Sequence, residues 1–182
     1  MSKMKQPIDI SDVEVKVEGQ KVIYKGKEAS GEHILLDYLD AKIEDKKLTV
    51  VCKRADDKSF VRRNKNFWGL HHALLANKIL GAKKLFEKQV KITGLGYKAQ
   101  LSGNKLNFSL GYSHKIDLEF PKEVQIVVDK TGQLLTLKSA QKDLLGASCD
   151  RIKSLRPTEP YKGTGIKLAD EVIIRKAGKS KR

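Results

Sequence analysis

The octapeptide LSGNKLNF, residues 101–108, has a near duplicate in VEGQKVIY, residues 17–24. Both read apolar, polar, Gly, amide, Lys, apolar, any residue, aromatic, and they lie 84 positions apart. A glycine followed by an amide residue between two runs of alternating polarity is a β-hairpin signal. The chain therefore contains two similar predicted hairpins, which indicates an internal repeat.

The segments after each hairpin repeat in the same order. In the first half, strands flank Lys46-Lys47, and a polar loop over 55–66 leads to a helix that begins at Phe67 and that Gly81 ends. In the second half, strands flank Thr131-Gly132, and a helix begins near Ser139, whose hydroxyl can cap it.

Apolar residues at helical spacing predict the face that each helix buries. In the second helix these are Leu145, Cys149 and Ile152. In the first helix the stripe is wider: Phe67, Leu70 and Leu74, with Leu75 and Ile79 beside them.

The predicted fold class is α+β: two tandem homologous domains, each an antiparallel sheet covered on one face by a helix, plus a basic C-terminal extension. A strand over 90–93, with Val90 and Ile92 alternating with polar residues, leads into the second domain. The expected boundaries are an N-terminal arm at 1–10, a first repeat at 11–81, a second at 82–156 and the extension at 157–182.

The charge of the chain points to a polyanionic partner. Its 182 residues include 37 Lys and Arg against 22 Asp and Glu, a net charge of +15. Nucleic acid is the favoured partner class. A membrane is disfavoured because apolar runs fall well short of the roughly 20 residues that span a bilayer, and no apolar signal-peptide segment is recognised. Cys52 and Cys149 each lie in an apolar segment, which favours two buried thiols in a reducing compartment.

The last sixth of the chain concentrates this charge. Between Arg151 and Arg182 there are ten basic and three acidic residues, a net +7. Lys and Arg would neutralise phosphates, glycines would let backbone amides approach phosphate oxygens, and Tyr161 offers a ring face to a base or ribose. A solvated charged surface is the simpler alternative.

No catalytic constellation is recognised. The sequences GLG at 94–96 and GTG at 163–165 lack the rest of a dinucleotide-binding motif. His71 and His72 are adjacent, so on a helix they diverge by about 100° and suit a shared metal poorly. We expect no enzyme activity, no cofactor, no metal and no small-molecule substrate.

Other basic clusters are less decisive. The segment RRNKN at 62–66 is either an RNA-contacting loop or a solubilising linker. Residues 113–115 are expected in the turn after a strand and, with residues 96–98, along one edge of the second domain. The basic start at 1–10 is expected to become ordered on its partner.

Two blocks, GLGYKAQLSGNKLNFSLGYSHKIDLEFP and RPTEPYKGTGIKLADEVIIRKAGK, together resemble the bacterial and organellar family of large-subunit ribosomal protein six. The likeness extends over nearly the whole chain, including the start at Lys5, Pro7, Ile8 and Ile10, and the pair Trp68-Gly69. It implies two duplicated α+β domains, no enzymatic activity, and binding to large-subunit ribosomal RNA beside the sarcin-ricin loop and stalk base. The implied neighbours are other stalk-base ribosomal proteins and translational GTPases.

The resemblance also has departures. The family usually has Pro-Glu-Pro-Tyr-Lys-Gly-Lys-Gly where this chain has Pro157-Thr158 before Glu159 and Thr164 between the glycines, and Leu168 replaces a common aromatic. Family contacts at 158, 164 and 168 therefore do not transfer, whereas those at Tyr161, Lys162, Gly163 and Gly165 do.

Together, the residues and the resemblance predict a structural RNA-binding protein of the ribosome, in a cytoplasm or an organelle matrix. A free RNA-binding regulator or RNA chaperone is the alternative. The expected RNA-binding residues are Lys3, Lys5, Arg62, Arg63, Lys65, Tyr97, Lys98, Ser113, His114, Lys115, Arg151, Lys153, Arg156, Tyr161, Lys162, Gly163, Gly165, Lys167, Arg175, Lys176 and Lys179.

Overall fold

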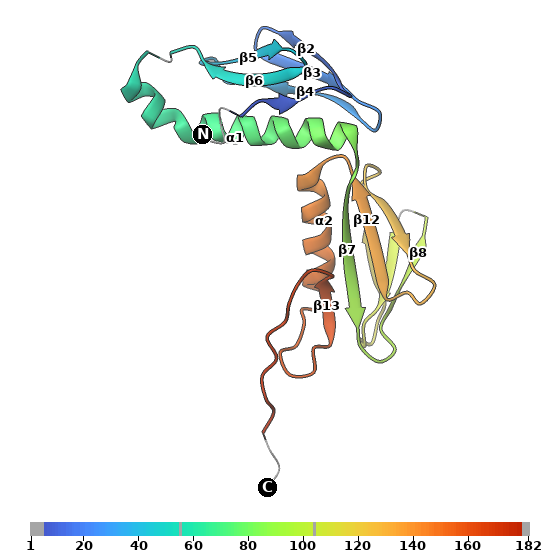
Figure 1. The fold of residues 1–182 in the computed structure, drawn as a ribbon. Coiled ribbons are helices and arrows are strands. Elements are labelled where there is room, and N and C mark those ends of the chain that lie inside the picture. The colour runs from blue at the N-terminus through green and yellow to red at the C-terminus, as the bar shows by residue number, and fades with distance from the viewer. Residues whose placement is uncertain (1–5, 55, 104, 180–182) are drawn as a thin grey trace. The chain divides into compact units, whose positions relative to one another are not determined.

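A computed structural model describes residues 6–54, 56–103 and 105–179, and the chain divides into two compact units, residues 1–85 and 86–182 (Figure 1). The first unit contains β1 (Ile8–Asp9), β2 (Glu14–Glu18), β3 (Lys21–Lys25), β4 (Ser30–Ile34), β5 (Leu39–Glu44), β6 (Lys47–Cys52) and α1 (Lys58–Lys83). The second contains β7 (Phe86–Thr93), β8 (Lys98–Ser102), β9 (Lys105–Ser109), β10 (Ile116–Glu119), β11 (Gln125–Val128), β12 (Leu134–Ser139), α2 (Lys142–Leu155) and β13 (Gly165–Leu168).

The two units share one topology, as expected for a duplication. In the first, the sheets run β1-β6-β5 and β2-β3-β4; in the second, β7-β12-β11 and β8-β9-β10 repeat these orders. All of these strand pairs are antiparallel. The predicted α+β class with two helix-covered repeats is confirmed, although each unit contains two sheets where the sequence indicated one.

The two octapeptides occupy the same place in their units. Val17 pairs with Val22 in the β2–β3 hairpin, and Leu101 pairs with Leu106 in the β8–β9 hairpin. Both glycines have φ near +60°, as a tight hairpin turn requires (Gly19 +61°, Gly103 +63°). Asn104, the other half of the second predicted turn, lies outside the described residues.

The turn between β5 and β6 is shifted by one residue from the prediction. Asp45 and Lys46 have φ of 43° and 61°, and Lys47 already belongs to β6. Two consecutive positive φ values give a two-residue turn whose twist matches the strands that it joins.

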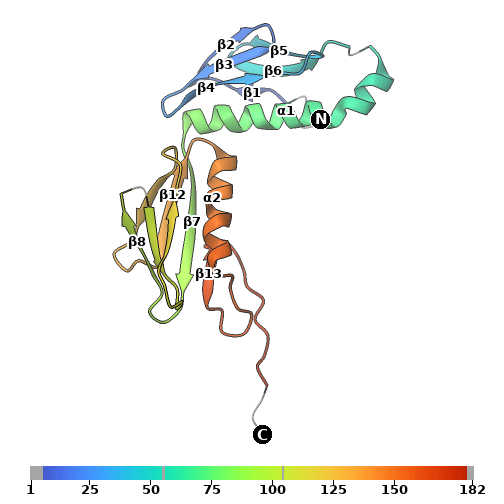
Figure 2. The ribbon, with the colours of Figure 1, turned by 180° about the vertical axis from the view of Figure 1, so that it is seen from behind.

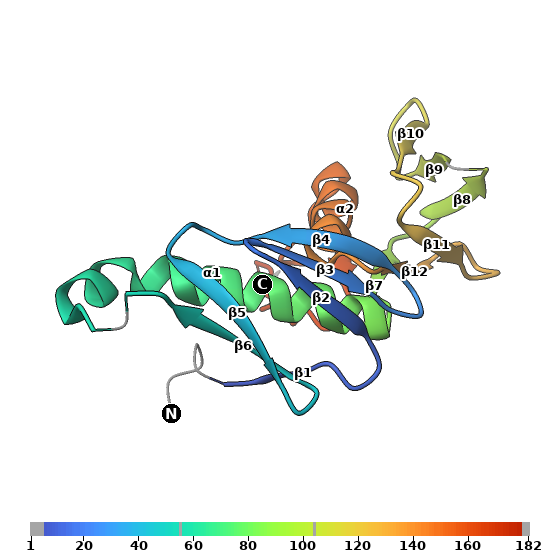
Figure 3. The same cartoon turned by 90° about the horizontal axis from the view of Figure 1, so that it is seen from above.

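Helix α1 covers the first unit, over β3 and β6 (Figure 3). Its buried residues include Trp68, Leu75 and Ile79, and the Trp68 indole N–H donates to the Val50 carbonyl oxygen at 3.0 Å. The stripe predicted from Phe67 and Leu70 is wrong, since these side chains are 52% and 49% exposed. The side of α1 that meets the sheets decides which residues are buried. That side is centred on Leu75 and Ile79.

Helix α1 is also longer than predicted at both ends. It begins at Lys58 because the Asp57 carboxylate accepts from the backbone N–H groups of Ser59 and Phe60, at 3.0 Å each. It passes through Gly81 and ends at Lys83. The polar loop predicted at 55–66 is therefore wrong for residues 58–66, which are helical.

Helix α2 lies against β7, β12 and β13 (Figure 2). Its predicted stripe is confirmed, because Leu145, Cys149 and Ile152 are each at most 1% exposed. Ser139 does not cap the helix. It is the buried last residue of β12, and its hydroxyl oxygen accepts from the N–H of Gln141 at 3.2 Å.

Both predicted terminal segments contribute to the units. Ile8 and Ile10, placed in the N-terminal arm, are 7% and 8% exposed, and β1 pairs with β6. The start of the extension supplies β13, which pairs with β7 at the register Ile166↔Ile92. The arm and the extension are therefore partly built into folded sheets, and residues 158–164 and 169–179 of the extension contain no helix or strand.

Candidate nucleic-acid interface

The second unit brings two tyrosines and one arginine together where α2 ends. The Arg156 guanidinium carbon lies 4.9 Å from the Tyr112 ring centroid and 5.3 Å from that of Tyr97, both within cation–π range. Arg156 also donates to the Leu110 carbonyl oxygen at 3.1 Å. These contacts join the loop after β7, the loop after β9 and the C-terminal cap of α2.

The loop after β9 carries the predicted residues Ser113, His114 and Lys115. All three are exposed, and they lie between β9 and β10 as the sequence indicated. The His114 ring is near that of Tyr112, with centroids 6.4 Å apart and planes inclined by 25°. This loop therefore presents an aromatic pair and a cation at the surface, beside the half-buried Arg156.

The glycine-rich start of the extension is fixed by the protein itself. Glu159 N–H donates to the Thr164 carbonyl oxygen at 2.9 Å, and Gly163 N–H donates to the Glu159 carbonyl oxygen at 3.0 Å. Gly165 has a φ of +131°, and a Cβ there would lie 2.6 Å from the Pro157 carbonyl oxygen. Contacts within the protein therefore require glycine at 165, whereas the sequence indicated contact with RNA as the reason for this glycine.

The end of the extension folds back on this turn. Lys176 N–H donates to the Pro160 carbonyl oxygen at 2.9 Å, and the Arg175 guanidinium lies over Gly163, where a Cβ would come within 3.1 Å of it. Tyr161 and Lys162 are exposed on the same turn. The structure therefore brings these predicted residues together in a compact cationic turn.

Glu171 engages two of the predicted RNA-binding lysines. Lys153 on α2 donates to its carboxylate at 2.6 Å, and Lys167 on β13 donates to its carbonyl oxygen at 3.3 Å. The hydrogen bond from Lys153 is the main reason that the pKa of Glu171 lies below its usual range. The Lys153 contact fastens the extension to α2, and the Lys167 contact lies within the extension.

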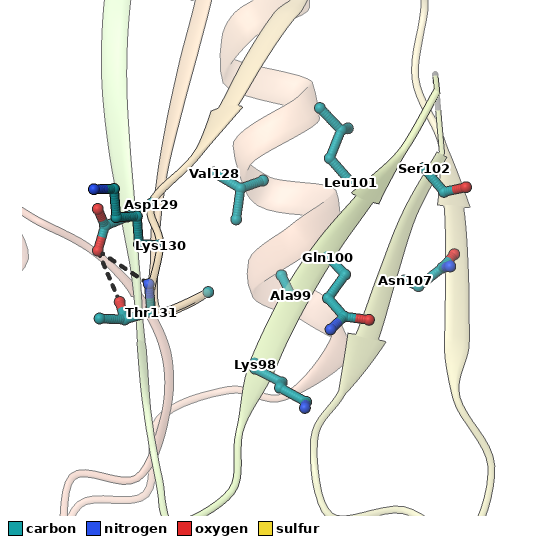
Figure 4. Close-up of a pocket in the computed structure, with 11 residues that line it drawn as sticks. Lys98, Ala99, Gln100, Leu101, Ser102, Asn107, Val128, Asp129, Lys130 and Thr131 are labelled. Carbon is teal, nitrogen blue, oxygen red and sulfur yellow. Dashed lines mark hydrogen bonds between the residues drawn. The ribbon is translucent and has the colours of Figure 1, made fainter.

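Lys98 lies apart from this turn, in a pocket between β8 and the β11–β12 turn (Figure 4). The pocket wall also includes Lys130 and the Asp129 carboxylate, which accepts from the Thr131 hydroxyl at 2.8 Å. The hydrogen bond from Thr131 is the main reason that the pKa of Asp129 is lowered. The pocket is open and contains two lysines and one carboxylate, separate from the cationic turn of the extension.

The predicted residues of the first unit form a separate group. Arg62, Arg63 and Lys65 are exposed on the first turns of α1, and Arg63 interacts with Ser59 one turn earlier. Their setting is a helix face, so neither the predicted loop nor the predicted linker describes them. Lys3 and Lys5 lie outside the described residues.

The remaining predicted residues are Arg151 and Lys179. Arg151 is exposed on α2 and lies 3.4 Å from the Glu119 carbonyl oxygen, whereas Lys179 is exposed near the end of the described chain. Within the described residues, no group of three or more His, Cys, Asp and Glu side chains is arranged to hold a metal ion. Among the same residues, no helix has the length and apolar character needed to span a membrane.

Two functional candidates were not identified from sequence. Tyr112 is next to a predicted residue, but its contact with Arg156 spans 44 positions and no local pattern shows it. Glu171 was counted only as one of three acids in the tail. The signal available for Tyr112 was its place in GYSH, between a strand and a basic turn.

Comparison with known proteins covers this surface and most of the chain. The family described as Ribosomal protein L6 matches residues 93–168, which include Tyr97, Arg156 and Gly163. The large ribosomal subunit protein uL6 of Nitratiruptor sp. is 42% identical over 177 residues, 97% of this chain and 96% of the relative. Those of Wolinella succinogenes and Magnetococcus marinus are 39% and 36% identical over 178 residues, again 97% of this chain and at least 96% of each relative. Since identity at this level extends through both repeats and the cationic extension, the chain belongs to the ribosomal protein uL6 family.

Proposed function

We propose that this protein is a structural constituent of the large ribosomal subunit, and that its second unit and extension bind large-subunit ribosomal RNA. The observation that carries the proposal is the cationic turn of the extension, with Tyr161, Lys162, Arg175 and Lys176, in a chain of the uL6 family with a net charge of +15. Because the backbone of the turn and its cations are held in place before binding, they lose less conformational entropy when they contact folded RNA.

The finer site within the subunit is also part of the proposal. We place the protein beside the sarcin-ricin loop and stalk base, in contact with neighbouring ribosomal proteins and close to where translational GTPases dock, in a cytoplasmic ribosome. The protein would keep this RNA in shape for factor binding and would itself carry out no reaction. Hydroxyl-radical footprinting of the bound RNA tests the position: protection elsewhere in the subunit would refute it.

Three exposed lysines of the second unit provide a direct test of the RNA surface. Lys115, Lys162 and Lys176 have no side-chain ion pair within the described part of the chain, so their replacement by Ala should leave the fold intact. Each lost phosphate contact reduces the slope of log affinity against log salt by about 0.7 to 0.9. Binding of the triple variant to transcribed large-subunit RNA should therefore show a slope reduced by about 2 to 3.

The matched control removes the same charge from the first unit. Lys16, Lys27 and Lys42 are also exposed, and their replacement by Ala should change the slope far less. Equal effects of the two triple variants would mean that net charge alone drives binding, and the proposed surface would be wrong. Circular dichroism of both variants controls for folding.

The alternative, a free RNA-binding regulator or chaperone, shares the charge but predicts a different distribution in the cell. Fractionation of ribosomes at low salt, followed by mass spectrometry, separates the two. A ribosomal constituent is expected in the large-subunit fraction at about one copy per particle, whereas a free regulator would sediment apart from it.

A further inference from the structure

We propose that Tyr112 and His114 form a stacking platform for the base of an unpaired RNA nucleotide, with Arg156 fixing the platform from beneath the loop. The inference rests on the proposed RNA-binding function and adds the chemical class of the ligand at this place. It gives a role to Tyr112, which was absent from the residues that the sequence indicated.

The Tyr112 ring is held in position although it is not part of the core. It is 45% exposed, yet its hydroxyl donates to the Leu155 carbonyl oxygen at 3.1 Å, at the last residue of α2. The Arg156 guanidinium carbon lies 4.9 Å from the ring centroid, and Arg156 in turn donates to Leu110, two residues before the tyrosine. The ring is therefore fixed both at its tip and by the cation against it.

The two other exposed rings of comparable size lack this arrangement. Tyr161 is 53% exposed and Phe67 is 52% exposed, and neither ring has a hydrogen bond or ring contact within the described part of the chain. A ring that is already fixed loses little conformational entropy when a ligand stacks on it. Exposure combined with fixation therefore singles out Tyr112.

His114 adds a second ring to the platform. Its ring is inclined by only 25° to that of Tyr112, with centroids 6.4 Å apart, and the residue is exposed. Two exposed rings at this inclination and separation are close enough to contact the same nucleotide. Lys115 follows directly in the chain and is exposed, so a phosphate can be neutralised next to the base.

This surface matches an unpaired nucleotide better than a duplex. In an A-form helix the bases are stacked inside and a side chain meets phosphates and 2′-hydroxyls, whereas bases in loops and bulges can stack on aromatic rings. The contribution of such stacking is about 1–3 kcal/mol per base, which corresponds to a change in affinity of roughly 5- to 150-fold. Cations alone would bind both forms.

The test uses the full chain and two RNA probes. The first is a hairpin whose loop consists of unpaired adenosines, one of them replaced by the fluorescent base 2-aminopurine. The second is a blunt duplex of the same stem. Tyr112→Ala should weaken hairpin binding about 5-fold or more and duplex binding less than about twofold, and the change in 2-aminopurine fluorescence seen with the unaltered protein should be lost.

Three further variants make the result decisive. Tyr112→Phe retains the ring and should retain most of the hairpin affinity. His114→Ala removes a side chain that has no hydrogen bond within the described residues, so it tests the platform even if Tyr112→Ala misfolds. Phe67→Ala, which removes an exposed ring from the first unit, should change neither affinity.

The outcomes separate this inference from the proposed function. Equal losses on hairpin and duplex, or no loss with either Tyr112→Ala or His114→Ala, would overturn the platform. If those variants behave in this way while the unaltered protein still binds transcribed large-subunit RNA, only the platform fails. If the unaltered protein does not bind that RNA, the proposed function fails with it.

Discussion

Acidification should destabilise the first unit through one buried histidine. His33 on β4 is 6% exposed, and its Nε2 lies 3.1 Å from Nδ1 of His71 on α1. Burial, followed by the nearby charges of Lys78 and His71, lowers the pKa of His33 from 6.5 to about 4. Lys78 is held beside it because its ammonium group donates to the Glu32 carbonyl oxygen at 2.9 Å.

The sign and size follow from proton linkage. An unfolded chain protonates His33 below pH 6.5, whereas the folded unit resists protonation down to about pH 4, so stability is complete above pH 6.5 and falls between these values. A difference of one pKa unit corresponds to about 1.4 kcal/mol, so the lowered pKa accounts for roughly 2.5 kcal/mol at pH 4.5 and about 3.5 kcal/mol at most. For a domain of this size, about 2.5 kcal/mol lowers the melting temperature by about 10–20 °C.

The single tryptophan provides an assay that is specific to this unit. Trp68 is buried on α1, so its fluorescence during urea denaturation reports the unfolding of the first unit. Comparison of pH 7 with pH 4.5 stays above the range in which the carboxylates of Asp9 and Asp57, whose pKa values are lowered, lose their contribution. The expected loss in the free energy of unfolding is about 2.5 kcal/mol.

His33→Gln removes the titrating group while keeping a polar side chain. Its unfolding free energy should be lower at pH 7, but the difference between pH 7 and pH 4.5 should shrink to less than about half. If the variant retains the full pH dependence of the unaltered protein, His33 is not the responsible group and the reasoning from its burial is refuted.

Two further predictions concern packing. Gly165→Ala should destabilise the second unit by about 1–3 kcal/mol without RNA, because the φ of +131° and the Pro157 carbonyl oxygen both exclude a Cβ. Gly178→Ala, in open space, should be neutral in the same thermal denaturation experiment. Equal melting temperatures of the two variants would contradict the structural explanation of Gly165. Trp68→Phe removes the indole donor to Val50 and should cost about 1–3 kcal/mol in urea denaturation followed by circular dichroism, whereas an unchanged midpoint would mean that this buried bond contributes little.

The hairpins were predictable because their signals are local. In β2–β3, a glycine between two runs of alternating polarity predicts the turn, and in the structure this glycine has a positive φ. The similar octapeptide 84 positions later predicts the same hairpin for β8–β9. The start of α1 was missed for a physical reason. Residues 58–66 are mostly polar and show no apolar period, and the helix begins there through the Asp57 cap. The stripe on α1 was misassigned because the sequence offers more apolar residues than the sheets cover.

The site was predictable in composition but not in arrangement. Arg156 and Tyr97 could be named from basic and aromatic character, but their contact joins the two ends of the second unit and depends on how β7 and α2 pack. Tyr112 had no sequence signal beyond its neighbours. The glycines of the extension were assigned to phosphate approach, although the closeness of Gly165 to Pro157 already requires glycine in the free protein.

A count of charges between Arg151 and Arg182 therefore overstates what is available to RNA. Among these cations, Lys153 and Lys167 are bonded to Glu171, and Arg156 is bonded to Leu110. The Lys153 bond holds the extension against α2, and the Arg156 bond holds the cap of α2 against the loop after β9. The backbone bonds of the turn position the main chain at Lys162 and Lys176. Each cation used within the fold lowers the number of phosphates that can be neutralised, but it also lowers the entropy that the others lose on binding. A salt slope smaller than the charge count implies, together with a high affinity, is the expected consequence of this division.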